Sequence, residues 1–498
     1  MIDLRLLREN PGAFREGARK KRIQVDIDRL LALDARRREL AVQIEQMRAD
    51  QNRLAKETGP EIGRLSALLK QAEGAERDRL VEQLEELKDR PAMLKTEIAG
   101  LEEEIRDIEP CLRDLLLQVP LPPDEDVPVG TSSDDNVELR RWSPAGFDPE
   151  RSFQENRGFA PRPHLDLVRQ HRLADFERGV KLAGSRSYLL TGDGARLHNA
   201  VLRYALDFIV QRGFTPVTVP VLVREEAMIG TGFFPGGREQ AYHIDETTRQ
   251  SPDEESAAAP RAGSISDGRP APGPAAASPK AHGGDGRATD RSRDLYLTGT
   301  GEVSLMGMRM DEILDEAELP LKLCTVSTCF RREAGAAGKD TAGLYRIHQF
   351  DKVEQVVICR ADVAESRRWH KEMIGIVEDF LKSLEIPHRL LQCCTGDLGP
   401  KNADMIDIES WMPGRNSYGE THSASRLYDY QCRRLNMRYR PGGEKGKGAT
   451  TFCHSLNNTV AASPRILIPI LELYQNADGS VTVPAVLRPY MNGMERIG

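Results

Sequence analysis

The sequence predicts an α+β protein in which a long helical hairpin precedes a body that contains strands. Apolar residues spaced three and four apart run through residues 27–68 and again through 80–115, which is the spacing of coiled-coil helices. Two runs at 327–333 and 346–354 instead alternate with a period of two, as strands do, and a glycine-containing loop joins them. A proline-rich stretch at 119–123 ends the helical pattern, so the two parts form different domains.

The two heptad segments have similar lengths, which favours an antiparallel hairpin. The first begins near Asp28, the second ends near Leu117, and Ala72–Ala75 offers a glycine turn midway. At 1.5 Å per residue the arms extend on the order of 60 Å. The pattern alone leaves two uses open, a dimerising coiled coil or an arm that binds a partner. Basic residues suited to phosphate contacts, or merely to a solvated surface, are Arg15, Arg19, Lys20, Lys21, Arg22, Arg36, Arg37 and Arg38.

Composition limits the class of protein. The 498 residues suggest two to four domains, and 39% hydrophobic with 30% charged residues is ordinary for a soluble globular protein. With 70 basic against 77 acidic residues, any RNA contact must come from local basic patches. The eight cysteines form no C-x-x-C pair, and neither a signal peptide nor an 18-residue apolar run is present. We therefore expect a cytoplasmic protein without a zinc ribbon, a disulfide framework or a membrane span.

Changes in composition along the chain suggest the domain boundaries. We expect the helical hairpin over residues 1–117, a linker over 118–135 and the body over 136–498. Residues 246–293 are rich in Pro, Ala, Gly and Ser and lack large apolar residues over most of their length. Such a segment buries too little surface to offset the entropy lost on ordering, so we expect a disordered insertion there.

Within the body several segments have clear periods. Ala195–Arg212 and Asp362–Leu384 read as helices, and Asp407–Pro413 alternates as a strand. Gly213–Val223 reads as a strand after a helix, and its Pro220 favours the edge of a sheet.

Charged groups collect on one face of the two strand-like runs. Arg331 and Glu333 share a face of the first run, and Arg346, Phe350 and Glu354 share a face of the second. A guanidinium binds phosphate oxygens in pairs, and an aromatic ring stacks on a base, so this face suits a nucleotide such as ATP. A solvated hairpin with cross-strand ion pairs is the alternative.

The stretch FRREAGAAGKDTAGLYRIHQFDKVEQ, residues 330–355, resembles the motif 2 hairpin of class II aminoacyl-tRNA synthetases, and among them the seryl-tRNA synthetase family. Gly213–Val223 resembles motif 1, His454–Arg465 with the apolar run after it resembles motif 3, and Leu295–Val303 resembles the family's substrate loop. The resemblance implies an antiparallel sheet flanked by helices, a homodimer formed through motif 1, and an N-terminal coiled-coil arm that grips tRNA-Ser.

The resemblance also implies a set of site residues. ATP would be bound by Arg331, Arg332, Glu333, Arg346, Phe350, Glu420, Thr421, His422, Ser423 and Arg465. Serine would be bound by Thr300, Gly301, Glu302, Arg331, Glu354 and Thr459. Arg331 would bridge the serine carboxylate and the α-phosphate, and Arg465 would hold the γ-phosphate. Glu420 and Ser423 offer the hard oxygen atoms that Mg²⁺ prefers, whereas His422 lacks neighbours that would make a zinc site.

Three segments depart from the family's usual text: the substrate loop, the stretch 420–426, where His422, Ala424 and Arg426 differ, and most places of motif 3. The substrate loop keeps Thr300 and Glu302, but Gly299 and Gly301 replace Pro and Ala. In motif 3, Ser463 is a good helix cap and Pro464 suits the first helical position, which would place Arg465 in the first turn of a helix that Pro469 bends.

The activity that the resemblance implies is that of a serine–tRNA ligase. Such an enzyme activates L-serine with ATP to seryl-adenylate and then transfers serine to tRNA-Ser. The altered substrate loop and motif 3 leave an alternative, a synthetase-like paralogue that activates an amino acid for another acceptor or binds RNA without catalysis.

Overall fold

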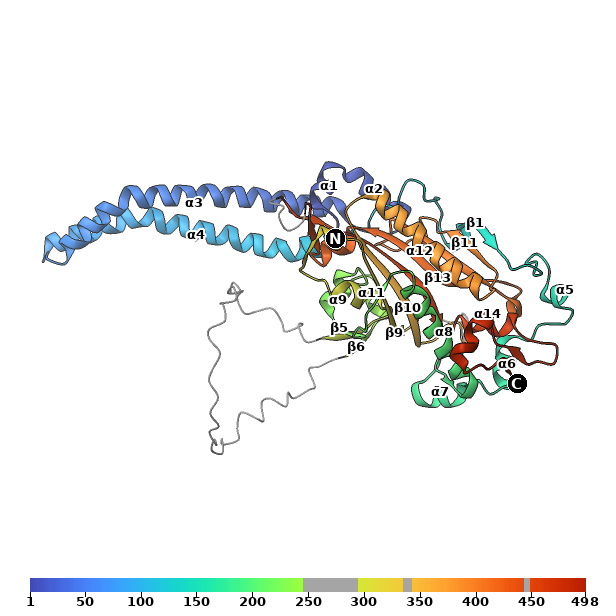
Figure 1. The fold of residues 1–498 in the computed structure, drawn as a ribbon. Coiled ribbons are helices and arrows are strands. Elements are labelled where there is room, and N and C mark those ends of the chain that lie inside the picture. Colours follow the sequence, from blue (N-terminus) through green and yellow to red (C-terminus); the bar gives the residue numbers. More distant parts are fainter. Residues whose placement is uncertain (245–293, 335–342, 443–447) are drawn as a thin grey trace, which may run out of the picture.

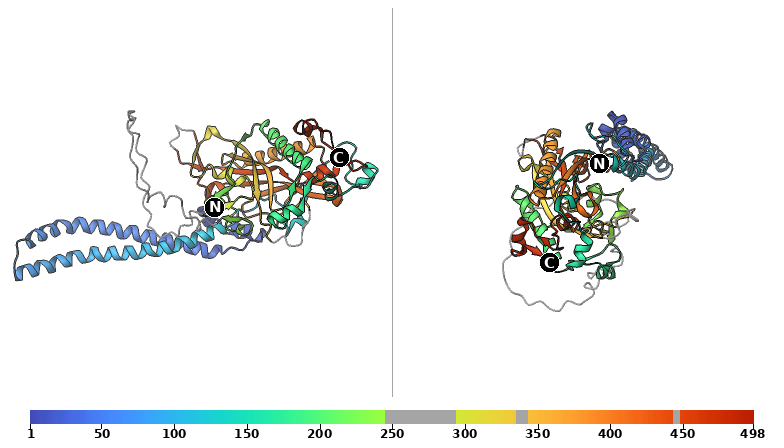
Figure 2. Two further views of the ribbon diagram at one scale, coloured as in Figure 1. Left: turned by 90° about the horizontal axis from the view of Figure 1, so that it is seen from below. Right: turned by 90° about the vertical axis from the view of Figure 1, so that its right-hand side faces the viewer.

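The computed structural model describes residues 1–244, 294–334, 343–442 and 448–498. A two-helix arm projects from a body built around one large sheet (Figure 1); the left view of Figure 2 shows the same projection, and in the right view the arm is seen nearly end-on. The predicted disordered insertion, 246–293, lies outside the described residues. No helix in the described ranges is long and apolar enough to cross a membrane.

The arm consists of two long antiparallel helices. Helix α3 spans Ile27–Leu69 with 43 residues and α4 spans Ala75–Gln118 with 44 residues. Gly74 begins the return with φ of 60°, a left-handed conformation that glycine adopts without steric cost. Many of the predicted apolar positions are buried between the two helices, among them Leu30, Leu40, Ile44, Leu84, Leu94, Ile98 and Leu112, whereas Leu68 near the tip is 45% exposed. The predicted antiparallel hairpin is therefore confirmed, and α4 continues through Pro91 without a break.

Several basic residues proposed for phosphate contacts already have partners within the protein. Arg36 forms an ion pair with Glu104 of the opposite helix at 2.7 Å, which joins α3 to α4. Arg37 and Arg38 both contact the buried Asp34. The Arg36–Glu104 pair is partly exposed, and such pairs contribute little to stability, whereas the Asp34 carboxylate is fully buried.

Lys21 differs, because it is 3% exposed and donates hydrogen bonds to backbone carbonyls of the body. It follows the short helices α1 (Leu4–Glu9) and α2 (Pro11–Lys20). The suggestion that Lys21 contacts phosphate is therefore wrong.

An eight-stranded sheet forms the centre of the body. Its order is β1-β11-β12-β13-β16-β10-β9-β4, and only β4 pairs in parallel. The bounds are β1 Val137–Trp142, β11 His388–Gln392, β12 Asp404–Met412, β13 Ser417–Tyr428, β16 His454–Ser463, β10 Gln349–Cys359, β9 Leu321–Phe330 and β4 Thr215–Pro216. The predicted antiparallel sheet flanked by helices is confirmed.

Two predicted helices cover one face of this sheet. Helices α8 (Gly192–Val210) and α12 (Val363–Ser383) pack on alternate residues of β10 and β16, including Val357 and Leu456. The intervening residues of β10 and β16, such as Glu354 and Thr459, point to the other face. A cavity lined in part by Thr459 lies on that face.

Two strand boundaries differ from the prediction. Strand β9 ends at Phe330 and β10 begins at Gln349, so neither Arg331–Glu333 nor Arg346–His348 belongs to a strand. The alternating pattern fails there because Glu333 turns the backbone with φ of 50°, whereas a strand needs a negative φ. Pro220 lies in no strand either, because β4 ends at Pro216 and β5 begins at Leu222.

A three-stranded sheet stands beside the main one. It contains β5 (Leu222–Arg224), β7 (Leu295–Leu297) and β6 (Tyr242–Ile244), in that order, and α9 (Glu225–Gly230) and α11 (Glu302–Gly307) follow β5 and β7. The smaller elements are α5 Phe153–Arg157, α6 His164–Gln170, β2 Ala174–Asp175, α7 Phe176–Ala183, β3 Leu189–Leu190, β8 Ile313–Asp315, α13 Tyr430–Arg434, β14 Arg438–Arg440, β15 Thr451–Phe452, α14 Leu467–Leu473, β17 Val481–Thr482 and β18 Arg496–Ile497.

Candidate active site

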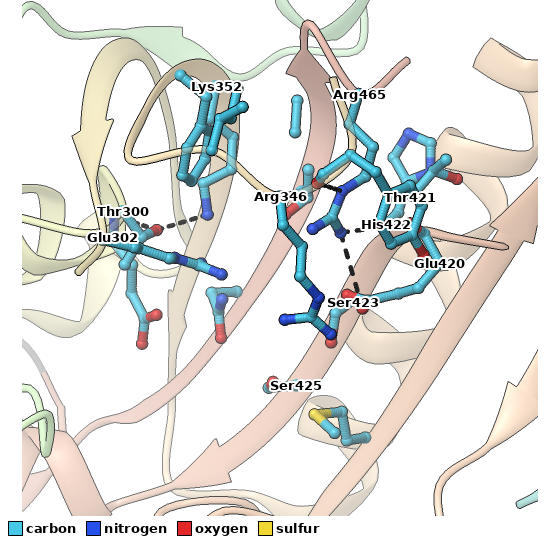
Figure 3. Close-up of a pocket in the computed structure, with 18 of the residues that line it drawn as sticks. Thr300, Glu302, Arg346, Lys352, Glu420, Thr421, His422, Ser423, Ser425 and Arg465 are labelled. Atoms are coloured by element: carbon cyan, nitrogen blue, oxygen red, sulfur yellow. Dashed lines mark hydrogen bonds and ion pairs between the residues drawn. The ribbon is translucent and has the colours of Figure 1, made fainter. Parts of the chain in front are cut away.

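A cavity of about 210 Å³ lies on the sheet face opposite α8 and α12. It brings together most of the site residues expected from the sequence: Thr300, Glu302, Arg331, Glu333, Arg346, Phe350, Glu420, Thr421, His422, Ser423, Thr459 and Arg465. Figure 3 shows two groups in it, with Thr300, Glu302 and Lys352 on one side and Glu420 and Arg465 on the other. We call the first the carboxylate end and the second the arginine end.

Three expected residues do not line the cavity. Arg332 is exposed, and its backbone N–H donates to the Gln240 carbonyl at 3.0 Å. A Cβ atom on Gly301 would come within 2.4 Å of the Thr325 side chain, so glycine is required where the family usually has alanine. Glu354 lies buried beneath the cavity floor.

Glu354 anchors the carboxylate end from below. Its side chain is fully buried and accepts hydrogen bonds from Asn457 at 3.0 Å and Thr459 at 3.4 Å. Lys352 lies 2.6 Å from the same carboxylate and also donates to the Thr300 hydroxyl at 2.7 Å. The alternating pattern places Lys352 beside Glu354, but only the structure shows that it joins Glu354 to the loop carrying Thr300.

Glu302 has two partners that sequence reasoning missed. Lys401 and Gln431 both contact its Oε1 atom at 2.6 Å. Glu302 is 2% exposed, so this carboxylate is buried with a cation beside it. No motif signals these partners, because Lys401 and Gln431 come from segments far away in the sequence.

Arg331 borders both ends of the cavity. Its Nε atom donates to the Gly299 carbonyl at 3.3 Å, next to Thr300, and its guanidinium lies 5.3 Å from the centre of the Phe350 ring. Across the cavity, Arg346 forms an ion pair with Glu333 at 3.3 Å. The residues directly after β9 and directly before β10 thus supply these charged groups, although these residues belong to neither strand.

Arg465 is fixed by backbone carbonyls. It donates to Tyr345 at 3.2 Å and to Glu420 at 3.3 Å, and its guanidinium lies 4.6 Å from the Tyr345 ring centre. It sits in a turn between β16 and α14, because β16 runs to Ser463 and α14 begins only at Leu467.

The prediction that Ser463 caps a helix and that Arg465 lies in its first turn is wrong. The Ser463 hydroxyl is instead within 2.8 Å of the His198 ring on α8, so it is not available to cap α14. Pro469 is the third residue of α14, where the N–H has no intrahelical partner, so the expected bend is unnecessary.

A bulge in β13 brings the proposed magnesium ligands to the same side. Two residues of β13, Glu420 and Thr421, stand opposite the single residue Glu409 of β12, where the register shifts. Without this shift the alternation would send Glu420 and Ser423 to opposite faces. The Glu420 side chain is 46% exposed and both residues line the cavity, so the oxygen donors fit Mg²⁺.

Beside these ligands lies a buried acid. Burial and the nearby Glu420 carboxylate raise the pKa of Asp407 well above its usual value. The raised pKa of Asp407 favours its neutral form, which reduces the negative charge at this position.

His422 contributes to the cavity wall, but its ring is held by the protein. One ring nitrogen is 2.8 Å from the Thr421 hydroxyl and the other is 3.1 Å from the Val460 carbonyl, and the ring faces Phe380 of α12. Burial lowers the pKa of His422 to about 3, so the ring is neutral. Both ring nitrogens are therefore engaged by the protein, and the assignment of His422 to the ATP site stays a prediction.

Comparison with known proteins identifies the family. Residues 1–122 match the model of the seryl-tRNA synthetase N-terminal domain, and residues 287–474 match the tRNA synthetase class II core domain (G, H, P, S and T). A serine--tRNA ligase of Deinococcus radiodurans is 40% identical over 499 residues, covering 100% of this chain and 99% of the relative. The chain belongs to the seryl-tRNA synthetase family. A serine--tRNA ligase of Thermomicrobium roseum is 38% identical and is covered to 95% of its length.

Solved structures of the seryl-tRNA synthetase family agree in fold along the whole chain. The seryl-tRNA synthetase from Pyrococcus horikoshii complexed with ATP has a TM-score of 0.74 and 33% identity, covering 100% of this chain and 99% of that one. The cytoplasmic serine-tRNA ligase from Naegleria fowleri in complex with AMP has a TM-score of 0.75 and 30% identity, with 100% and 98% coverage. The resemblance and the fold class predicted from the sequence are therefore confirmed.

Proposed function

We propose that the cavity binds L-serine at its carboxylate end and ATP at its arginine end. The chain is an enzyme that activates serine with ATP and then transfers it to tRNA-Ser. The observation that supports this assignment of sites is that one cavity holds the buried Glu302 carboxylate at one end, with Lys401 and Gln431 on only one of its oxygens, and the Arg465 guanidinium at the other end. The ammonium group of serine requires an acidic end, and the phosphates of ATP require a basic one.

Activation joins the two substrates without a general base. The serine carboxylate is already ionised near neutral pH. Its oxygen attacks the α-phosphorus of ATP, a new O–P bond forms, and the bond to the bridging oxygen breaks with its electron pair leaving on pyrophosphate. Alignment and charge stabilisation therefore supply the rate enhancement.

Arg331 is placed to act at the reacting atoms. It lies beside the Thr300 loop and against Phe350, and it lines the same cavity as Arg465. In this position one group binds the serine carboxylate and the α-phosphate together, which reduces their mutual repulsion.

The remaining nucleotide contacts come from residues held by the protein itself. Arg465 would bind the γ-phosphate, and its two carbonyl partners keep the guanidinium in place before ATP arrives. Glu333, Arg346 and Phe350 would contact the base and the adjacent phosphate. Thr421 and His422 would form the wall behind the nucleotide.

Mg²⁺ would be held by Glu420 and Ser423. The ion would neutralise phosphate charge when bound, which is the usual role of magnesium with nucleotides. Arg465 and Arg346 would orient the phosphates.

The second step transfers serine to RNA. A hydroxyl oxygen of the terminal ribose attacks the carbonyl carbon of the adenylate and loses its proton, while the bond from that carbon to the phosphate oxygen breaks and AMP leaves with that oxygen and the electron pair. The arm formed by α3 and α4 would grip tRNA-Ser, two chains would associate through the segment around β4 at the sheet edge, and the enzyme would work in the cytoplasm. The homodimer and the RNA contact both rest on the family.

Serine-dependent exchange of labelled pyrophosphate into ATP tests the first step, and charging of purified tRNA-Ser tests the second. We expect both with serine and neither with threonine or alanine, because a cavity built around buried polar groups penalises a poor fit. Exchange without charging would instead support a paralogue that serves another acceptor, and the absence of exchange would refute the assignment.

A further inference from the structure

The loop Gly399–Ala403, between β11 and β12, lies between the base of the arm and the cavity. On the arm side, the Lys21 ammonium donates to the Gly399 carbonyl at 3.0 Å and also to the Asn402 carbonyl. Lys21 is 3% exposed, and burial lowers its pKa to about 7. Burying a lysine costs free energy, and the hydrogen bonds that Lys21 makes to the loop offset this cost.

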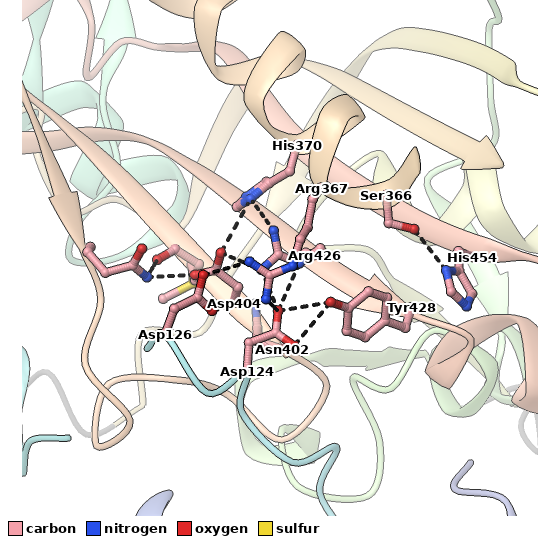
Figure 4. Close-up of polar contacts among 12 residues, drawn as sticks. Asp124, Asp126, Ser366, Arg367, His370, Asn402, Asp404, Arg426, Tyr428 and His454 are labelled. Carbon is pink, nitrogen blue, oxygen red and sulfur yellow. Dashed lines mark hydrogen bonds and ion pairs between the residues drawn. The ribbon is translucent and has the colours of Figure 1, made fainter. Parts of the chain in front are cut away.

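The linker after α4 binds the same loop through its backbone. The Leu121 N–H donates to the Pro400 carbonyl, and the Asp124 N–H donates to the Ala403 carbonyl, both at 2.9 Å. The side chain of Asp124 contacts Arg426, which also lies 2.9 Å from Asp404 (Figure 4). The loop is therefore attached to the arm base at both of its ends.

On its other side, the loop carries two side chains to the cavity. Asn402 donates to the Ser425 hydroxyl at 2.8 Å, and Lys401 contacts Oε1 of Glu302 at 2.6 Å. The Lys401 ammonium also lies 4.0 Å from the centre of the Phe233 ring. Its side chain is 14% exposed, so the ion pair with Glu302 is largely shielded from water.

The contacts of Glu302 suggest what Lys401 does. Lys401 and Gln431 both reach Oε1, and within the described ranges no hydrogen bond to Oε2 is found. Two partners on one oxygen fix the rotation of the carboxylate, which leaves the second oxygen for an incoming ammonium group. Gln431 is itself fixed, because it donates to the Thr231 carbonyl and accepts from Ser455.

We propose that Lys401 is a positioning residue that orients Glu302 for the ammonium group of serine, and that Lys21 at the arm base sets the loop that carries Lys401. The inference rests on the proposed serine site. It adds a specific consequence, that serine affinity depends on how the base of the arm is seated although the arm itself contacts neither small substrate.

Lys401→Met tests the first half of the proposal by serine-dependent pyrophosphate exchange. The variant keeps the length of the stem and its contact with Phe233 but removes the charge. We expect the KM for serine to rise by about tenfold to a hundredfold, since hydrogen bonds to charged groups are worth that much, while the KM for ATP stays within about twofold. An unchanged KM for serine would overturn the assignment.

If the methionine variant does not fold, Lys401→Arg replaces it. This variant should also raise only the KM for serine, because the bulkier guanidinium cannot reproduce the single contact of the ammonium group.

Lys21→Met tests the second half from outside the cavity. We expect the KM for serine to rise by about threefold, a fraction of the effect of a direct contact, with the KM for ATP unchanged. Lys371→Met, an exposed lysine on α12 on the other sheet face, is the matched control and should change neither value. Equal rises in both KM values would show a general loosening of the body and refute the connection through the loop. A wild-type enzyme without any serine-dependent exchange would instead refute the proposed function, so the two failures are distinguishable.

Discussion

Two neighbouring arginines at the end of β9 have different surroundings. Arg331 lines the cavity and contacts Phe350, whereas Arg332 is exposed outside it. Replacing Arg331 with alanine should reduce the rate of pyrophosphate exchange by about 10² to 10³, because one preorganised charge donor is lost from the transition state. Replacing Arg332 with alanine should reduce it by less than about threefold, because Arg332 does not line the cavity although both arginines are exposed.

The comparison is made with both variants in the same exchange assay, after thermal melting has shown that each is folded. Similar losses in the two variants would mean that Arg332 reaches ATP, as the sequence resemblance alone suggests. Near-normal exchange in the Arg331 variant would remove the bridging role assigned to it.

His422 makes the stability of the enzyme depend on pH. Burial lowers its pKa to about 3, while the unfolded chain has a histidine pKa of about 6.5. Between these values the unfolded state binds the proton and the folded state does not, so stability is lost as pH falls through this range. At pH 5 the protonation difference at His422 should lower the free energy of unfolding by about 2 kcal/mol relative to neutral pH.

Urea unfolding at pH 7 and pH 5 measures this loss in the wild type and in His422→Gln. The glutamine variant cannot take up the proton, so its free energy of unfolding should fall by about 2 kcal/mol less between the two pH values. Equal falls in both proteins would mean that the ring is solvated in the folded state.

Single residues also mark what the sequence alone could not predict. The resemblance supplied Glu302, but its partners Lys401 and Gln431 lie about a hundred residues away and belong to no motif. Gly301 departs from the family pattern because Thr325 occupies the space that a Cβ atom needs. Both cases depend on contacts that only the folded chain creates.

Helices with a strong apolar period can be predicted from the sequence, but the residues at which strands and helices begin and end cannot. The heptads of α3 and α4 and the apolar period of α8 and α12 fix those helices, because one stripe of each helix must be buried. The end of β9 and the start of α14 are set by distant contacts instead, such as the His198 ring that binds Ser463. Local propensity cannot anticipate a partner on another element.

The small sheet beside the cavity shows how a large insertion can be tolerated. Strands β6 and β7 pair antiparallel, with Ile244 opposite Leu295, so the chain on either side of the 246–293 segment is already adjacent. Replacing this segment with a short Gly/Ser turn should therefore preserve the pairing. We expect the serine-dependent exchange rate and the melting temperature to stay near the wild-type values.

Exchange kinetics and thermal melting on the shortened chain check this expectation. A mock replacement, in which an unrelated Gly/Ser-rich segment of equal length takes the place of residues 246–293, is the control for chain length. A melting temperature lower by several degrees in both variants would show that the natural segment contributes contacts to the body.

At the scale of the whole molecule, the arm and the body share a core where they meet. Apolar residues of α1, α3 and α4, including Leu7, Leu30 and Leu112, pack with Tyr430 of the body. Arg434 donates to the Leu117 carbonyl at 2.7 Å, and Lys21 binds the loop before β12. The arm base is therefore part of the body, whereas farther out α3 and α4 are joined to each other, for example by the Arg48–Glu102 ion pair.

This division decides where the arm should be cut to test its role. Removing all of residues 28–117 would expose the shared core and would confuse loss of RNA binding with loss of stability. Replacing residues 44–100 with a short glycine-rich turn leaves the base intact and keeps the Arg36–Glu104 ion pair to close the shortened hairpin.

The shortened enzyme separates the two chemical steps. If the distal arm grips tRNA and the cavity holds all the small-molecule chemistry, serine-dependent exchange should remain within about twofold of the wild type, because no binding residue for ATP or serine has been removed. Charging of tRNA-Ser should fall by about a hundredfold or more through weaker RNA binding, since the arm supplies contacts to RNA shape and backbone. Sedimentation should still show a dimer of the shortened chain, as expected if the dimer forms through the sheet edge near β4. A dimerising coiled coil predicts the opposite result, a monomer in which exchange and charging fall together.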